Sequence, residues 1–181
     1  LGQGAGFYVN ATQKPWAPQY RMWDYVTEEL PRLLFSAFPL AEEAQAITGH
    51  SMGGHGALTL AMSFPGRFRS VSAFAPICHP TASDWGRKQF TAYLGRDEAT
   101  WAAHDATLLM RKRGFDGPIL VDQGTADQFA DLLMPEALAE AIALRRQGGT
   151  VRMQKGYDHS YFFVSTFMED HIGFHAKALY G

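Results

Sequence analysis

The residues Gly49-His50-Ser51-Met52-Gly53 constrain the fold of this chain more than any other stretch. In the pattern G-x-S-x-G the serine stands on a sharp turn between a strand and a helix, which projects its hydroxyl into a cleft. Such a turn crowds the backbone, so the positions two before and two after the serine must have almost no side chain. Gly49 and Gly53 meet this requirement. The pattern therefore predicts a strand that ends just before Ser51 and a helix that follows it.

The flanking residues fit this prediction. Residues 44–48 form a short run that is typical of a buried strand. Residues 55–62 have the composition of a helix, which Pro65-Gly66 would end. The segment is therefore predicted to be a strand, a turn that carries Ser51, and a helix.

Apolar periodicity predicts the remaining elements. We predict further strands at residues 68–75, 118–122 and 150–154. We predict further helices at residues 20–38, 88–93, 99–110, 135–147 and 161–179, and an ordered loop over residues 1–18. Pro31 is expected to kink the first of these helices, because proline has no N–H to donate to the preceding turn. Strands that alternate with helices indicate an α/β fold, with a mostly parallel sheet and helices on both faces.

The composition restricts the classes of function. With 181 residues, of which 46% are hydrophobic and 19% charged, residues 1–181 are expected to form a single domain. The net charge of -2, without a basic cluster, argues against binding to nucleic acid or to a membrane surface. No apolar run reaches the roughly 18 residues of a membrane-spanning helix. A single cysteine, Cys78, excludes an internal disulfide and favours a reducing compartment.

Three loops at the predicted carboxyl ends of strands carry Ser51, Asp127 and His159. Ligands of open α/β sheets collect at these ends. The order serine, aspartate, histidine along the chain is that of α/β-hydrolase triads. We expect Ser51 to attack an acyl carbonyl, His159 to take and return its proton, and Asp127 to hold the imidazole in the required tautomer.

The other histidines are weaker candidates for the base than His159. His50 directly precedes Ser51, and we interpret it as a packing residue whose side chain points away from Ser51. His171 and His175 have the i, i+4 spacing that metal sites use, but no third ligand is evident, which favours a plain helix face. We therefore expect no metal and no cofactor. His55 falls in the helix predicted after Ser51, and solvated or capping roles are expected for His79 and His104.

Few other aspartates are candidates for the acid of the triad. Asp122 is still inside a predicted strand, and Asp131 has moved into the next element. Asp158 is too close to His159 in sequence to approach its ring. These arguments leave Asp127.

The oxyanion hole should use the backbone N–H of Met52, the residue after the nucleophile. Its second donor belongs to a loop after an earlier strand, and the chain contains no such loop. Since the chain also begins at Leu1 instead of methionine, we interpret it as the C-terminal part of a longer polypeptide, a partial domain that lacks the N-terminal strands.

Several strings resemble the S-formylglutathione hydrolase (esterase D) family of α/β-hydrolases. They are GAGFYVNAT at 4–12, YRM at 20–22, GHSMGGHGAL at 49–58, SAFAPI at 72–77, WGRKQF at 85–90, YLG at 93–95, DQGTAD at 122–127 and GYDHSY at 156–161. The resemblance implies a cytoplasmic, metal-free thioesterase that hydrolyses S-formylglutathione to glutathione and formate. The nucleophile, acid and base of the family correspond to Ser51, Asp127 and His159.

Two alternatives stay open. One is a general carboxylesterase of the same fold, since the family also accepts simple aryl and alkyl esters. The other is an inactive truncated remnant that only binds a partner or an acyl ligand. Sheet edges left exposed by absent strands would favour association, for example as a homodimer.

Overall fold

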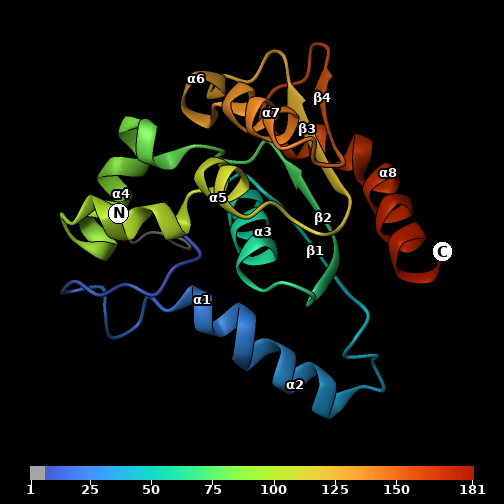
Figure 1. Ribbon diagram of the computed structural model, residues 1–181, viewed down its shortest axis with the longest axis horizontal. Helices are drawn as coiled ribbons and strands as arrows, with labels where there is room; N and C mark the ends of the chain where they lie inside the picture. The colour runs from blue at the N-terminus through green and yellow to red at the C-terminus, as the bar shows by residue number, and fades with distance from the viewer. Residues whose placement is uncertain (1–6) are drawn as a thin grey trace.

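The computed structural model describes residues 7–181, whose backbone forms a parallel sheet flanked by helices (Figure 1). The four strands of this described part are, in spatial order, β1 (Gln45–His50), β2 (Phe68–Phe74), β3 (Ile119–Gly124) and β4 (Gly149–Gln154). Each neighbouring pair is parallel, so the carboxyl ends of all strands lie at one edge of the sheet. Residues 1–6 lie outside the described residues. They include the start of the predicted loop over 1–18 and the first three residues of the sequence GAGFYVNAT at 4–12.

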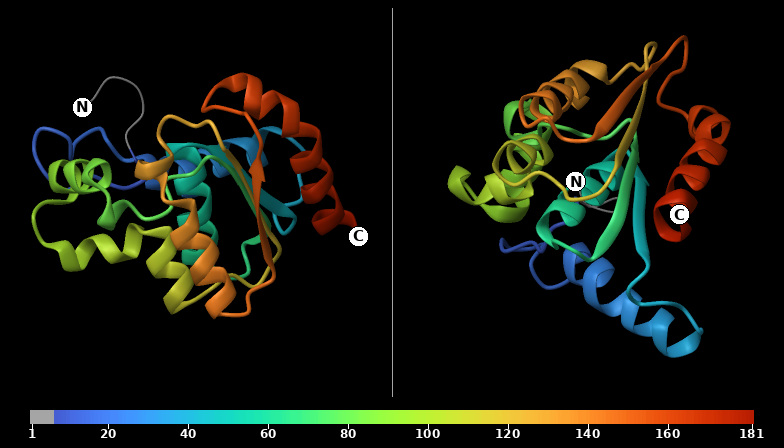
Figure 2. Two further views of the ribbon diagram at one scale, coloured as in Figure 1. Left: turned by 90° about the horizontal axis from the view of Figure 1, so that it is seen from above. Right: turned by 45° about the vertical axis from the view of Figure 1, so that its right-hand side comes forward.

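Helices cover both faces of the sheet, as predicted. On one face α3 (Met52–Ser63), α5 (Ala106–Lys112) and α7 (Pro135–Leu144) enclose a hydrophobic core. On the opposite face α8 (Tyr161–Tyr180) packs against β1, β2 and β3, as both views in Figure 2 show. None of the helices between residues 7 and 181 is long and apolar enough to cross a membrane.

The predicted helix over residues 20–38 is interrupted. α1 (Met22–Asp24) passes into a π-helical turn, η1 (Tyr25–Glu29), which continues as α2 (Leu30–Ala37). Pro31 stands at the start of α2 and has no N–H to donate to the carbonyl four residues earlier. The wider turn ahead of the proline accommodates this loss. The irregularity expected at Pro31 itself therefore lies in the residues that precede it.

The excursion between β2 and β3 contains more helix than predicted. It contains η2 (Pro80–Ala82), α4 (Asp84–Leu94) and η3 (Glu98–His104), and α6 (Ala130–Leu133) follows β3. Of these, η2 and α6 have no predicted counterpart. α4 begins before the predicted residue 88, because the Ser83 hydroxyl accepts from the N–H of Gly86 and caps it. The predicted helix over 99–110 is two elements. Asp105 accepts from the N–H of Leu108 and so begins α5 as a separate helix.

Strand β1 passes into α3 through a tight turn at Ser51. Ser51 has a φ of 57°, in a region that residues with a side chain rarely adopt. Its N–H donates to the carbonyl oxygen of Phe74 at 2.9 Å, which ties the turn to the end of β2. A Cβ atom on Gly49 would lie 2.2 Å from the carbonyl oxygen of Gly53. Position 49 therefore requires glycine, because the two backbone segments are too close for any side chain.

A buried polar network attaches α8 to the sheet. The carboxylate of Asp122 accepts from Arg152 Nε at 2.6 Å and from His171 Nε2 at 3.1 Å. The second ring nitrogen of His171, Nδ1, lies 2.8 Å from Ser72 Oγ, and its ring stacks on Phe74 with centroids 3.7 Å apart. The network thus joins β2, β3 and β4 to α8, which begins just after the predicted base. It sets where that base can lie.

We predict that Gly49→Ala destabilises the protein by about 1–3 kcal/mol or more. The new methyl group would overlap a backbone carbonyl that no side-chain rotation can move aside. Urea unfolding measures the change, and Gly173→Ala in α8 is the matched control. A Cβ at position 173 meets nothing within 4 Å, so this control should keep or raise stability. Equal losses in both variants would contradict the prediction.

Acid unfolding should depend on Asp122. Burial raises the pKa of Asp122, but hydrogen bonds from Arg152, His171 and Gln154 outweigh it and lower the pKa to about 2. The pKa of an unfolded aspartate is about 3.9. Ionised Asp122 therefore stabilises the fold above that value, and this contribution is lost as the pH falls toward the folded pKa.

We expect Asp122→Asn to lower the free energy of unfolding by about 3–5 kcal/mol at neutral pH. The difference from the unmodified protein should shrink as the pH falls from about 4 to about 2. Urea titrations over this range measure it, with the exposed Asp116→Asn as control. A difference that does not vary with pH would show that the charge of Asp122 is not what stabilises the fold.

Candidate active site

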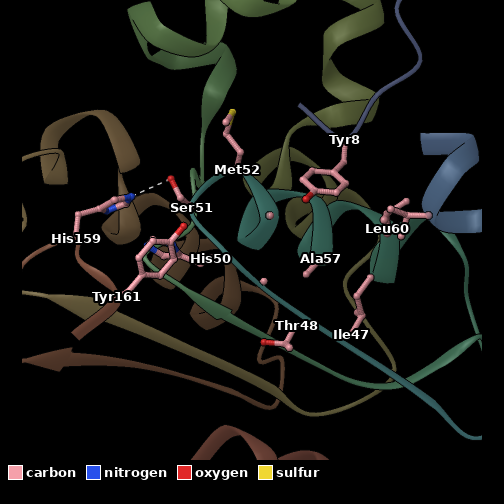
Figure 3. Close-up of a pocket in the computed structure, with 13 residues that line it drawn as sticks. Tyr8, Ile47, Thr48, His50, Ser51, Met52, Ala57, Leu60, His159 and Tyr161 are labelled. Carbon is pink, nitrogen blue, oxygen red and sulfur yellow. Dashed lines mark hydrogen bonds between the residues drawn. The ribbon is translucent and has the colours of Figure 1, made fainter. Parts of the chain in front are cut away.

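The structure brings the three predicted side chains together at the carboxyl edge of the sheet. His159 Nε2 lies 2.9 Å from Ser51 Oγ, and His159 Nδ1 lies 2.7 Å from Asp127 Oδ2. Figure 3 shows the contact between the serine and the imidazole as a dashed line. When Nδ1–H donates to the carboxylate, Nε2 is left as an acceptor for the serine proton. The arrangement can therefore convert a hydroxyl into a nucleophile.

Asp127 is held in place by neighbours that sequence reasoning missed. Its side chain has no exposed surface. Gln123 Nε2 donates to Oδ2 at 2.9 Å, and the N–H of Phe129 donates to Oδ1 at 2.8 Å. A bond from an aspartate to the N–H two residues later is a common local turn, which is a signal that could have identified Phe129. Nothing in the sequence marks Gln123.

The loop that carries Asp127 touches the loop that carries His159. The N–H of Ala126 donates to the carbonyl oxygen of Tyr157 at 2.9 Å. A Cβ atom on Gly124 would lie 2.2 Å from the same oxygen. The end of β3 approaches the second loop this closely because position 124 has no side chain. Contact between two backbones therefore sets the separation of acid and base.

Met52, the predicted oxyanion donor, is the first residue of α3. N–H groups in the first turn of a helix have no partner within the helix and carry partial positive charge. The backbone of Met52 thus lies beside Ser51 at the positive end of α3. Its role as an oxyanion donor stays a prediction.

A pocket of about 600 Å³ opens beside Ser51. Tyr8 and Tyr161 lie on opposite sides of the serine, and apolar side chains from β1, α3 and η1 form much of the wall (Figure 3). The lining comprises Tyr8, Val26, Ile47, Thr48, Gly49, His50, Ser51, Met52, Gly53, Ala57, Leu60, His159 and Tyr161. The nucleophile is therefore accessible from a cavity that could hold a small substrate.

His50 is predicted to be a packing residue whose side chain points away from Ser51. In the structure it lines the pocket, and its ring centroid lies 4.7 Å from that of His159. Burial, and then the electrostatic influence of the neighbouring His159 ring, lower the pKa of His50. A ring that favours its neutral form therefore lies against the predicted base.

His55, His79 and His104 are not among the residues that line the pocket. His55 lies in α3, as predicted, and is fully buried, with Nε2 2.6 Å from the carbonyl oxygen of His104; burial lowers its pKa to about 4. His104 itself is half-buried, and burial lowers its pKa too. His79 is half-buried and lies 2.8 Å from Asp105, the residue that caps α5. These rings serve packing and local hydrogen bonding.

His171 and His175 both face the sheet from α8. His175 Nδ1 lies 2.7 Å from Ser70 Oγ, and its Nε2 lies 2.7 Å from Ser72 Oγ. Hydroxyl and carboxylate partners thus occupy both rings. Among residues 7–181 no group of three or more His, Cys, Asp or Glu side chains is placed to hold a metal ion.

Comparisons with known proteins identify the family. The family model Esterase, described as "Putative esterase", matches residues 1–174. The S-formylglutathione hydrolase of Paracoccus denitrificans (strain Pd 1222) is 70% identical over 179 residues, and that of Mus musculus is 52% identical over 182 residues. Each alignment covers 99% of this chain and 64% of the relative, so the chain spans somewhat less than two thirds of the length of these curated relatives.

A solved structure of an S-formylglutathione hydrolase from Agrobacterium tumefaciens matches with a TM-score of 0.94. It is 49% identical, and the match covers 98% of this chain and 65% of that one. The fold is the predicted α/β-hydrolase fold, with a parallel sheet between two layers of helices. Because the family model matches residues 1–174 of this chain, the chain belongs to the esterase family that the model describes.

Proposed function

We propose that this protein is a serine thioesterase that hydrolyses S-formylglutathione to glutathione and formate. One observation carries the proposal: Asp127, His159 and Ser51 form a hydrogen-bonded chain, with distances of 2.7 and 2.9 Å, beside a pocket. Relatives that are 70% and 52% identical bear the name S-formylglutathione hydrolase, which supports the choice of substrate.

In the first half of the reaction Ser51 Oγ attacks the formyl carbon while His159 Nε2 takes the hydroxyl proton. Asp127 stabilises the imidazolium that forms. Negative charge develops on the formyl oxygen, where the N–H of Met52 would donate to it. The C–S bond then breaks, the thiol leaves with the proton from His159, and the formyl group stays on Ser51 as an ester.

In the second half water replaces the thiol. His159 takes a proton from the water, whose oxygen attacks the formyl ester. The ester C–O bond breaks, formate leaves, and the proton returns to Ser51 Oγ. The two halves balance without an oxidant, a reductant or a metal ion.

The proposed thiol product suggests a cellular location, and the sheet suggests an assembly. Free glutathione and the unpaired Cys78 both suit a reducing compartment, so we place the protein in the cytoplasm. We further infer a homodimer. β4 is an edge strand of the described sheet, and an edge strand presents unpaired N–H and C=O groups.

Ser51→Ala tests the proposed nucleophile. Without the hydroxyl no acyl-enzyme can form, and we expect kcat for S-formylglutathione to fall by about 10⁶-fold, to background. Release of glutathione measured with a thiol reagent reports the rate. Comparison with p-nitrophenyl acetate separates the alternatives. Equal preference for both substrates would favour a general carboxylesterase, and hydrolysis that survives the substitution, or is absent from the unmodified protein, would exclude this mechanism.

Asp127→Asn tests the acid. An asparagine can hold the imidazole in the wrong tautomer, with the proton on Nε2, and we expect kcat to fall by about 10⁴-fold. Steady-state kinetics measure the loss, and circular dichroism checks that the fold persists. The exposed Asp131→Asn, in the next element, is the matched control and should keep full activity. A loss of less than tenfold in Asp127→Asn would place the acid elsewhere.

A further inference from the structure

Gln123 takes no chemical part in the reaction as described, yet its side chain contacts the acid of the triad. It is the next-to-last residue of β3 and is fully buried. Its Nε2 donates to Asp127 Oδ2 at 2.9 Å and to the carbonyl oxygen of Gly124 at 3.2 Å. The same oxygen, Oδ2, lies 2.7 Å from His159 Nδ1. A single carboxylate oxygen therefore connects Gln123 to the predicted base.

The orientation of the Gln123 amide follows from its neighbours. The nitrogen and the oxygen of a glutamine amide have nearly the same shape, so the hydrogen-bond partners decide which end is which. Both atoms within reach of one end are acceptors, namely a carboxylate oxygen and a backbone carbonyl oxygen. These acceptors would repel an amide oxygen, so this end is the NH2 group. The other end, Oε1, is buried and makes no hydrogen bond to any residue between 7 and 181, so the side chain acts there as a donor only.

The carboxylate of Asp127 is held through both of its oxygens. The N–H of Phe129 donates to Oδ1 at 2.8 Å, and Gln123 donates to Oδ2. A bond to Oδ1 alone would leave the carboxylate able to turn about its Cβ–Cγ bond, because that torsion has a broad energy well. The second bond fixes the plane of the group. Oδ2 then stays directed at His159 Nδ1.

We propose that Gln123 is a positioning residue, whose amide holds Asp127 in the orientation that keeps His159 directed at Ser51. The inference deepens the proposed function and rests on it. His159 Nε2 can take the serine proton only while Nδ1 keeps its own proton, which the carboxylate holds in place. A carboxylate that turns away releases the ring, and a displacement of about 1 Å in a reacting group can cost about a hundredfold in rate.

The competing explanation is that Gln123 only secures the end of β3, through its bond to the carbonyl oxygen of Gly124. Its loss would then destabilise the protein without acting on the carboxylate. A double-mutant cycle separates the two explanations, because a residue that acts only through Asp127 has no effect once that side chain is removed. The cycle consists of Gln123→Met, Asp127→Ala and the protein with both changes. Methionine is unbranched like glutamine but has no N–H to donate.

The experiment measures kcat and KM of these proteins for p-nitrophenyl acetate and for S-formylglutathione, and circular dichroism checks the fold. We expect Gln123→Met alone to lower kcat by about 10- to 100-fold, the effect of one hydrogen bond to a charged group. KM should stay within about twofold, because the residue acts on the transition state and not on substrate binding. In the protein that carries Asp127→Ala, the same change should alter kcat by less than about threefold.

Gln147→Met is the matched control. The Gln147 amide also bonds to the backbone, donating to the carbonyl oxygen of Phe115 at 2.5 Å and accepting from its N–H at 3.1 Å. Gln147 does not line the pocket. This variant should therefore keep kcat, even where urea unfolding shows a loss of stability.

An unchanged kcat in folded Gln123→Met would overturn the inference, and so would a change confined to KM. Equal losses with and without the Asp127 side chain would overturn it too, because Gln123 would then act on another group. If Gln123→Met does not fold, Gln123→Asn takes its place in the cycle, since its amide is one methylene shorter and stays polar.

Failure of the proposed function is recognised separately. If the unmodified protein cleaves p-nitrophenyl acetate but not S-formylglutathione, the proposed substrate is wrong, and the ester alone completes the cycle. If it cleaves neither, the rate at which a fluorophosphonate labels Ser51 replaces kcat, because labelling needs the same activated hydroxyl. Absence of labelling would overturn the inference together with the mechanism.

Discussion

The approach of the β1 backbone to the first turn of α3 is the constraint on which the site depends. Ser51 is at a positive φ, and Gly49 lies so close to Gly53 that no side chain fits between them. The parallel sheet maintains this crowded turn, because the N–H of Ser51 is bonded to the end of β2. The nucleophile is therefore attached to rigid elements on both sides. Its hydroxyl needs little further ordering before it can react, which is how fixed orientation lowers a barrier.

The base reaches this hydroxyl from the other end of the chain, and its placement depends on α8. Only a short loop separates β4 from α8, and His159 lies within it. The buried carboxylate of Asp122 bonds Arg152 of β4 and His171 of α8 at once. Both ends of the loop are thereby fixed to the sheet. Separating these elements would leave the buried carboxylate without its partners, which is costly, so β3, β4 and α8 are held in one arrangement.

Much of the site could be predicted because its constraints are local. The turn at Ser51 follows from steric crowding within five residues, and the triad follows from chain order and from the strand ends. The π turn before Pro31, the bond from Gln123 to Asp127 and the contact between His50 and His159 could not. Each depends on which side chains meet after separate elements pack. His50 is the clearest case, because its neighbour in sequence is the nucleophile, whereas its neighbour in space is a residue more than a hundred positions later.

The sheet in fact carries two sets of serine, histidine and aspartate. On the face covered by α8, His171 joins Asp122 at 3.1 Å to Ser72 at 2.8 Å, distances close to those around His159. Ser72 lies within a regular strand, and all three side chains are buried, so no acyl group can reach the hydroxyl. Ser51 differs in standing on a strained turn at the edge of a pocket. Identical chemical groups thus stabilise the fold in one place and are poised to react in the other, and the difference lies in backbone geometry and access.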